Sequence, residues 1–181
     1  MDGVIGSYFS LTKPRVVVLL QITALCATLS HDLLSESGLG VGTLETMAVV
    51  LVGGYLTAGG ANAINMWYDR DIDPLMKRTA KRPIPSGDVS PNSALLFGVI
   101  ISLLGTFWLI IMANEVAAFW AAFSVAFYVL VYSIWLKRTT PQNIVIGGLS
   151  GALPPLIGWT AVTNEISLLP LILVLIIFLW T

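Results

Sequence analysis

Long apolar segments constrain this chain more than any other feature. A helix that crosses a bilayer needs about 20 predominantly apolar residues, and five segments reach that length, at about residues 16–34, 44–73, 94–113, 116–136 and 142–162. A sixth run, at 166–181, is short for a span. We therefore predict one all-α domain over residues 1–181, a polytopic transmembrane helical bundle with its last helix cut short.

The balance of charge agrees with a protein that lies in a membrane. Apolar residues make up 56% of the chain and charged residues only 10%, against roughly 25% charged residues in a soluble domain. The net charge of −1 gives no electrostatic reason to expect a nucleic acid. The lone Cys26 forms no intrachain disulfide, and no Cys/His spacing indicates a zinc or haem-attachment motif. The lipid bilayer is the partner that composition predicts.

Basic residues lie only on alternate loops, which predicts the topology. All nine fall before the first span, between the second and third, or between the fourth and fifth, and they are Lys13, Arg15, Arg70, Lys77, Arg78, Lys81, Arg82, Lys137 and Arg138. These loops and the N-terminus are therefore expected in the cytoplasm. No cleavage site follows the first basic pair, so the first helix is expected to be retained rather than removed as a signal peptide.

The end of the second span carries the most informative pattern. There, an apolar and glycine-rich segment meets two amides and three carboxylates in the run ANAINMWYDRDIDP. At about 100° per residue, four of these side chains share an arc of roughly 80° on a helix, namely Asn62, Asn65, Asp69 and Asp73. Asp71 points to nearly the opposite side. Pro74 disfavours helical geometry at Asp73, so we expect the helix to end there.

Two carboxylates one helical turn apart repel each other. At an effective dielectric near 20 and a separation of about 5 to 6 Å, the repulsion is about 3 kcal/mol. Oxygen ligands without His or Cys favour Mg²⁺ or Ca²⁺, and Mg²⁺ typically binds through carboxylates plus substrate phosphates. The alternative is a solvated helix end, with the acids paired to Arg70, Lys77 or Arg78. The absence of a cation inside the arc argues against that alternative.

Two basic loops follow on the same face. Arg78, Lys81 and Arg82 have a topogenic role, and guanidinium or ammonium groups there could also hold phosphate oxygens. The second loop, from Tyr132 to Asn143, also reads as an anchored, positively charged segment. Glycines at 147 and 151 have the spacing of close helix packing, and the pair Pro154 and Pro155 predicts a break in the fifth helix. His31 lies on the other side and is assigned no chemistry.

These stretches resemble the UbiA-type intramembrane prenyltransferases, and within them the branch that farnesylates haem. The resemblance rests on five motifs that together cover nearly the whole chain: LTKPRV at 11–16, NAINMWYDRDID at 62–73, RTAKRPIPSG at 78–87, LKRTTPQNIVIGG at 136–148 and GALPPLIGW at 151–159. The NxxxDxxxD pattern marks the superfamily, and the last two motifs are specific to the haem branch.

The resemblance implies transfer of farnesyl from farnesyl diphosphate to a vinyl group of haem B, giving haem O. It implies Mg²⁺ held by Asn65, Asp69 and Asp73, with Arg78, Lys81 and Arg82 as catalytic cations. Further substrate-binding positions are then Lys13, Arg15, Asn62, Tyr132, Lys137, Arg138 and Asn143. It also implies a bacterial inner membrane, or else the mitochondrial inner membrane, with a second copy of the chain or a haem A synthase as a protein partner.

The family pattern also has parts that this sequence lacks. Its members have about nine helices and a second acidic motif beyond the sixth, so about six of nine helices are expected here, in a truncated chain. The alternatives are an aromatic quinone acceptor, a non-catalytic remnant, or a small transporter. A transporter's ionisable residues should lie near the bilayer midplane, whereas these cluster at the cytoplasmic end, which favours the enzyme.

Overall fold

The computed structural model describes residues 3–36 and 38–180. Every regular element in these two ranges is helical. The α-helices are α1 (Val4–Leu11), α2 (Pro14–Leu34), α3 (Val41–Tyr68), α4 (Pro91–Met112), α5 (Glu115–Ala126), α6 (Asn143–Ala152), α7 (Pro154–Thr163) and α8 (Leu168–Trp180). Short 3₁₀ turns form η1 (Asp69–Asp71), η2 (Asp73–Leu75) and η4 (Leu136–Arg138), and a π-helix forms η3 (Phe127–Trp135).

Five helical stretches are long and apolar enough to cross a membrane. They are Pro14–Leu34, Val41–Asp71, Pro91–Met112, Glu115–Arg138 and Asn143–Thr163. The last helix, α8, has 13 residues and is too short to span by itself. Thr181, the final residue of the predicted sixth helix, lies outside the described residues. The chain is an integral, multi-pass membrane protein, and the predicted all-α bundle is confirmed.

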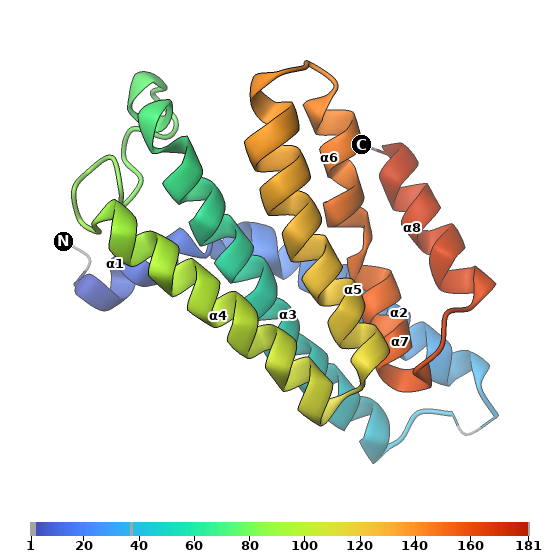
Figure 1. The fold of residues 1–181 in the computed structure, drawn as a ribbon. Coiled ribbons are helices and arrows are strands. Elements are labelled where there is room, and N and C mark those ends of the chain that lie inside the picture. The colour runs from blue at the N-terminus through green and yellow to red at the C-terminus, as the bar shows by residue number, and fades with distance from the viewer. Residues whose placement is uncertain (1–2, 37, 181) are drawn as a thin grey trace.

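Helices α3 and α4 run antiparallel along one side of the bundle (Figure 1). Glycines allow their backbones to approach closely, because a Cβ atom at Gly60 would lie 2.1 Å from the Ser102 hydroxyl oxygen and 2.5 Å from the Gly98 carbonyl oxygen. Close approach of this kind is the usual way in which helices pack in lipid, where no hydrophobic force drives them together.

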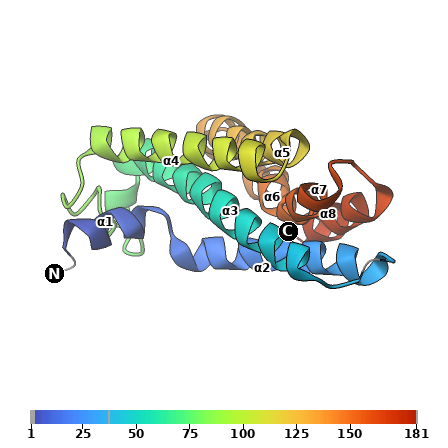
Figure 2. The same ribbon diagram turned by 90° about the horizontal axis from the view of Figure 1, so that it is seen from below.

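A turn of the view shows α2 as one layer, with α4 and α5 on the opposite side (Figure 2). Helix α7 crosses α2 at Gly158, where a Cβ atom would lie 2.1 Å from the Ala24 carbonyl oxygen. The predicted break in the fifth span is confirmed: α6 ends at Ala152 and α7 begins at Pro154. Proline cannot donate the backbone hydrogen bond that would continue α6.

A short helix precedes the first span and was not predicted. Helix α1 ends at Leu11, and Lys13 separates it from α2 with a left-handed backbone, φ 51° and ψ 62°. That conformation is uncommon for a residue other than glycine. It redirects the chain between the two helices and brings the Lys13 side chain back toward the end of α3.

Candidate active site

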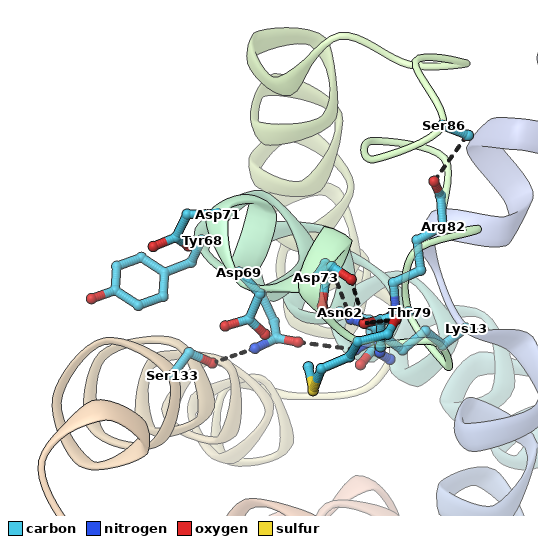
Figure 3. A network of polar contacts seen from close by, with 12 residues as sticks. Lys13, Asn62, Tyr68, Asp69, Asp71, Asp73, Thr79, Arg82, Ser86 and Ser133 are labelled. Carbon is cyan, nitrogen blue, oxygen red and sulfur yellow. Dashed lines mark hydrogen bonds and ion pairs between the residues drawn. The ribbon is translucent and has the colours of Figure 1, made fainter.

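The acidic and amide residues at the end of α3 face the interior. Asp69 and Asp73 are 0% and 1% exposed, and Asn62 and Asn65 are also buried. Asp71, by contrast, has a side chain that is 56% exposed, and it points away from the others in Figure 3. The segregation expected from helical spacing is therefore present in the structure.

The backbone leaves the α-helix earlier than the predicted end at Asp73. Helix α3 stops at Tyr68, and the chain continues as the two 3₁₀ turns η1 and η2. Pro74 has no backbone N–H to donate, so a regular α-helix cannot continue through it. The Thr79 hydroxyl donates to the Asp73 carbonyl oxygen at 2.7 Å, which anchors the following loop beneath the carboxylates.

Each buried carboxylate has a cation that comes from a different loop. The Lys137 ammonium pairs with Oδ2 of Asp69. The Nη1 atom of Arg82 lies 2.8 Å from both carboxylate oxygens of Asp73. The sequence interpretation found no compensating cation because it considered only the arc of one helix. In the folded chain, two cations balance the two buried negative charges.

The local pairing that the alternative reading required does not form. Arg70 donates instead to the Trp67 carbonyl oxygen at 2.9 Å, and its guanidinium lies over the Trp67 ring. Lys77 and Arg78 are exposed, and neither pairs with a carboxylate in the part of the chain that the structure describes. Asp69 and Asp73 are thus not part of a solvated helix end.

A third cation reaches the amide at position 65. The Lys13 ammonium donates to Oδ1 of Asn65 at 3.0 Å, and the amide nitrogen of Asn65 donates to the Ser133 hydroxyl at 3.0 Å (Figure 3). Loss of contact with water lowers the pKa of Lys13 from its ordinary value to about 8, and the positive charges of Arg82 and Lys137 act in the same direction. Three cations therefore converge where an anion would relieve their mutual repulsion.

One carboxylate oxygen in this cluster has no partner. Oδ1 of Asp69 is buried and makes no hydrogen bond, which is costly for a charged group. No group of three His, Cys, Asp or Glu side chains in the described ranges could hold a metal ion. Mg²⁺, however, commonly takes one or two carboxylates and completes its shell with phosphate oxygens and water. Asn65, Asp69 and Asp73 supply a donor set that fits this ion.

An apolar cavity begins at Asn62, beside this cluster, and runs into the bundle. Along α3 it is lined at one-turn intervals by Asn62, Ala58, Gly54 and Val50. At about 1.5 Å per residue, this stripe extends roughly 18 Å from the polar end. Tyr128 also lines the cavity, and its hydroxyl lies 3.5 Å from Oδ1 of Asn62. The cavity thus has a polar end beside the cluster, formed by Asn62 and Tyr128, and a long apolar one.

The remaining predicted site residues are divided between the cluster and the surface. Arg15 and Lys81 are exposed and form no ion pair in the described part of the chain. Arg138 pairs with the exposed Asp71 at 2.7 Å and so lies on the opposite side of η1. Asn143 donates to the nearby Thr140 carbonyl oxygen.

Tyr132 lies between the loop and the bundle. Its ring stacks on Tyr128, with centroids 5.2 Å apart, and the Lys137 ammonium lies 5.9 Å from its centroid. The structure therefore brings Lys13, Asn62, Asn65, Asp69, Asp73, Arg82, Tyr132 and Lys137 together, and leaves Arg15, Arg78, Lys81, Arg138 and Asn143 outside the cluster.

Several residues of the site were not predicted. Ser133 and Tyr128 come from the π-helix η3, where the Ser133 hydroxyl donates to the Tyr128 carbonyl oxygen at 2.8 Å. A π-helical turn of this kind is often found at functional sites, but no local sequence pattern predicted it. The stripe of small residues at 54 and 58 was visible as a repeat of one helical turn and could have indicated the cavity.

A bundle of membrane-spanning helices with a charged, acid-and-amide cluster at one end of an apolar cavity defines a membrane protein that can hold an amphiphile with an anionic head. The chain matches the model of the UbiA prenyltransferase family over residues 17–181, and it belongs to that family.

Curated relatives with a common name show which members of the family this chain is similar to. The chain is 51% identical to the protoheme IX farnesyltransferase of Beijerinckia indica subsp. indica over 176 residues, which cover 97% of this chain and 53% of the relative. It is 49% identical to the protein of the same name from Bartonella tribocorum over 177 residues, 98% of this chain and 55% of the relative. It is 47% identical to the protein of the same name from Symbiobacterium thermophilum over 178 residues, which cover 98% of this chain and 57% of the relative.

The chain spans about half the length of the curated relatives it matches. No solved structure gives a significant match.

Proposed function

We propose that the protein transfers the farnesyl group of farnesyl diphosphate to a vinyl group of haem B, giving haem O. The observation that carries the proposal is the buried cluster of acids, amides and three cations at the head of a long apolar cavity. The names of the relatives, all protoheme IX farnesyltransferases, support the choice of both substrates. The bilayer-embedded cavity accounts for an apolar donor.

The proposed reaction breaks one carbon–oxygen bond and forms one carbon–carbon bond and one carbon–oxygen bond. The bond between the first farnesyl carbon and the diphosphate oxygen breaks, and its electron pair leaves with diphosphate. The terminal vinyl carbon of haem B bonds to that farnesyl carbon, which places a positive charge on the inner vinyl carbon. Water adds there and releases a proton, so the products are haem O, diphosphate and H⁺.

The residues of the cluster have separate roles in this proposal. The farnesyl chain lies along the stripe of Ala58, Gly54 and Val50, which excludes water from an allylic cation. The diphosphate lies at the end of α3, within reach of the cations Lys13, Arg82 and Lys137. These donors are arranged before the reaction and stabilise the negative charge that develops on the leaving group.

Asn65, Asp69 and Asp73 would hold Mg²⁺. When bound, this ion neutralises phosphate charge and acts as a Lewis acid toward the leaving group. In this structure Arg82 pairs with the oxygens of Asp73, Lys137 pairs with one oxygen of Asp69, and Lys13 donates to the amide oxygen of Asn65. We infer that these three side chains turn to phosphate oxygens when the substrate arrives, because the diphosphate then supplies negative charge for them to bind.

The membrane and its orientation belong to the same proposal. The three cations of the site come from loops that the distribution of basic residues assigns to the cytoplasm, so the diphosphate is supplied from that side of a bacterial inner membrane. A haem A synthase or a second copy of the chain would be sought by co-purification from mild detergent.

Mass spectrometry tests the choice of acceptor. Membranes that contain the protein are given haem B, farnesyl diphosphate and Mg²⁺, with a 4-hydroxybenzoate-type quinone precursor in a parallel sample. Formation of haem O, lost when Asp73→Ala is used, supports the proposal. A prenylated quinone precursor without haem O would place the acceptor in the alternative class, and no prenylated product from either sample would indicate a chain without catalytic activity.

A further inference from the structure

A second cavity, which we call the slot, lies beside the first. It lies between η3, α6 and α8, has a volume of about 300 Å³ and is more open than the main cavity. Its walls include Tyr128 and Tyr132 from η3, Gly147 and Gly151 from α6, and Ile177 from α8. This volume lies at the lower end of the range of about 300 to 1,000 Å³ that is usual for small-molecule sites.

The walls of the slot include two aromatic rings and carry few polar atoms. The rings of Tyr128 and Tyr132 are stacked, with an interplanar angle of 22°. Tyr132 lies directly on the backbone of α6, because a Cβ atom at Gly147 would lie 2.2 Å from its Cδ2 atom. Stacked aromatic rings and bare backbone form a surface that suits a flat aromatic ligand better than a branched one.

The slot meets the main cavity at three shared residues. Tyr128, Ser150 and Gly151 line both cavities. A Cβ atom at Gly151 would meet nothing within 4 Å, so the junction has open space on the side of α6. The Tyr128 hydroxyl lies 3.5 Å from Oδ1 of Asn62, at the end of the main cavity where the farnesyl carbon that reacts must lie.

We propose that the slot binds the planar macrocycle of the acceptor, with the reacting vinyl group directed at the junction beside Gly151. This inference rests on the proposed function, because that function requires a second, flat and largely apolar substrate to approach the diphosphate end of the first. The slot supplies a separate route to that end, so both substrates can be bound at once. An acyl chain of a bilayer lipid is the competing occupant.

Binding of a macrocycle that lacks iron tests the slot without any contribution from iron coordination. The full chain is reconstituted in lipid nanodiscs, and saturable binding of protoporphyrin IX is followed by energy transfer from tryptophan, with empty nanodiscs as the baseline. Binding of farnesyl S-thiolodiphosphate with Mg²⁺, an unreactive donor analogue, is measured on the same samples. Size-exclusion chromatography checks that each variant is folded.

Two substitutions should fill the slot, and each has a matched control. Ile177 lines the slot from α8, and Ile177→Trp should fill part of it. Its control is Ile176→Trp, because Ile176 is the next residue along α8, lies outside the slot lining and is 59% exposed. Ile144→Trp lies at the mouth of the slot, where a larger side chain needs no repacking because Ile144 is 65% exposed. Ile146→Trp, on the same helix but outside the slot, is its control.

We expect both slot variants to weaken porphyrin binding by about tenfold or more, because the indole ring takes space that the macrocycle would occupy, while donor-analogue binding stays unchanged. If a folded Ile144→Trp variant binds porphyrin as well as the wild type does, the slot is not the macrocycle site, and the proposed function is unaffected. A wild-type chain that binds the donor analogue but no porphyrin overturns both, because the acceptor is then not a macrocycle and a lipid chain occupies the slot.

Discussion

Lys137 and Asp69 form an ion pair across 68 residues of sequence, while the other oxygen of the same carboxylate is buried without a partner. The pair joins the end of the second span to the loop after the fourth. A buried carboxylate that is only half satisfied is ready to accept a further cation. This asymmetry separates Asp69 from Asp73, both of whose oxygens accept from Arg82.

The first prediction concerns this unpartnered oxygen. Asp69→Asn keeps the size of the side chain but removes the charge, so Mg²⁺-dependent turnover of farnesyl diphosphate should fall by about 100-fold or more. Asp71→Asn is the matched control, because Asp71 lies two residues away on the exposed side and should retain turnover. Turnover is measured as diphosphate release. If both variants lose the same amount of turnover, the loss comes from the reduced negative charge at the helix end and not from removal of a metal ligand.

The second prediction concerns the cation on Asp73. Arg82→Gln leaves a carboxylate that is 1% exposed without its ion pair, and breaking a buried pair on one side costs about 3 to 5 kcal/mol. The thermal midpoint of the detergent-solubilised protein should therefore fall, and farnesyl diphosphate should partly restore it only if Mg²⁺ is present.

Lys81→Gln is the control for this change. Lys81 is adjacent to Arg82 but exposed and unpaired in the described residues, so its thermal midpoint should match that of the wild type. A loss as large as that of Arg82→Gln would indicate that the loop depends on total charge and not on the contact with Asp73.

Much of this architecture was predictable because it depends on patterns within one helix. The spans follow from apolar length, and the burial of Asn62, Asn65 and Asp69 with exposure of Asp71 follows from helical spacing. The break at Pro154 follows from the missing backbone donor. Each of these inferences needs only residues that are near in sequence.

Contacts between distant segments were not predictable in this way. Nothing local indicates that Lys137 rather than Lys77 reaches Asp69, or that Arg82 rather than Arg78 reaches Asp73, because all four residues lie in basic loops on one face. The choice depends on how η4 and the loop after η2 fold over the end of α3. The same holds for Ser133, whose position is set by the π-helical turn.

The third prediction tests the close packing of α3 and α4. Gly60→Ala should destabilise the protein by about 1 to 3 kcal/mol, because the added Cβ would lie 2.5 Å from the backbone oxygen of Gly98, which cannot move independently. Gly151→Ala adds the same atom where nothing lies within 4 Å, and its stability should equal that of the wild type. Reversible unfolding in mixed micelles measures both, and equal stability of the two variants would contradict the packing argument.

The fourth prediction tests the position of the prenyl chain. Gly54 lies eight residues, or about 12 Å at 1.5 Å per residue, from Asn62 along the cavity-lining stripe of α3. Gly54→Leu should block the far end, so kcat/KM for farnesyl diphosphate should fall by about tenfold relative to geranyl diphosphate, a difference typical of extra carbons in an apolar pocket. Val52→Leu, on an exposed face of α3, should keep the wild-type ratio. If Gly54→Leu also keeps it, the farnesyl chain does not follow this stripe.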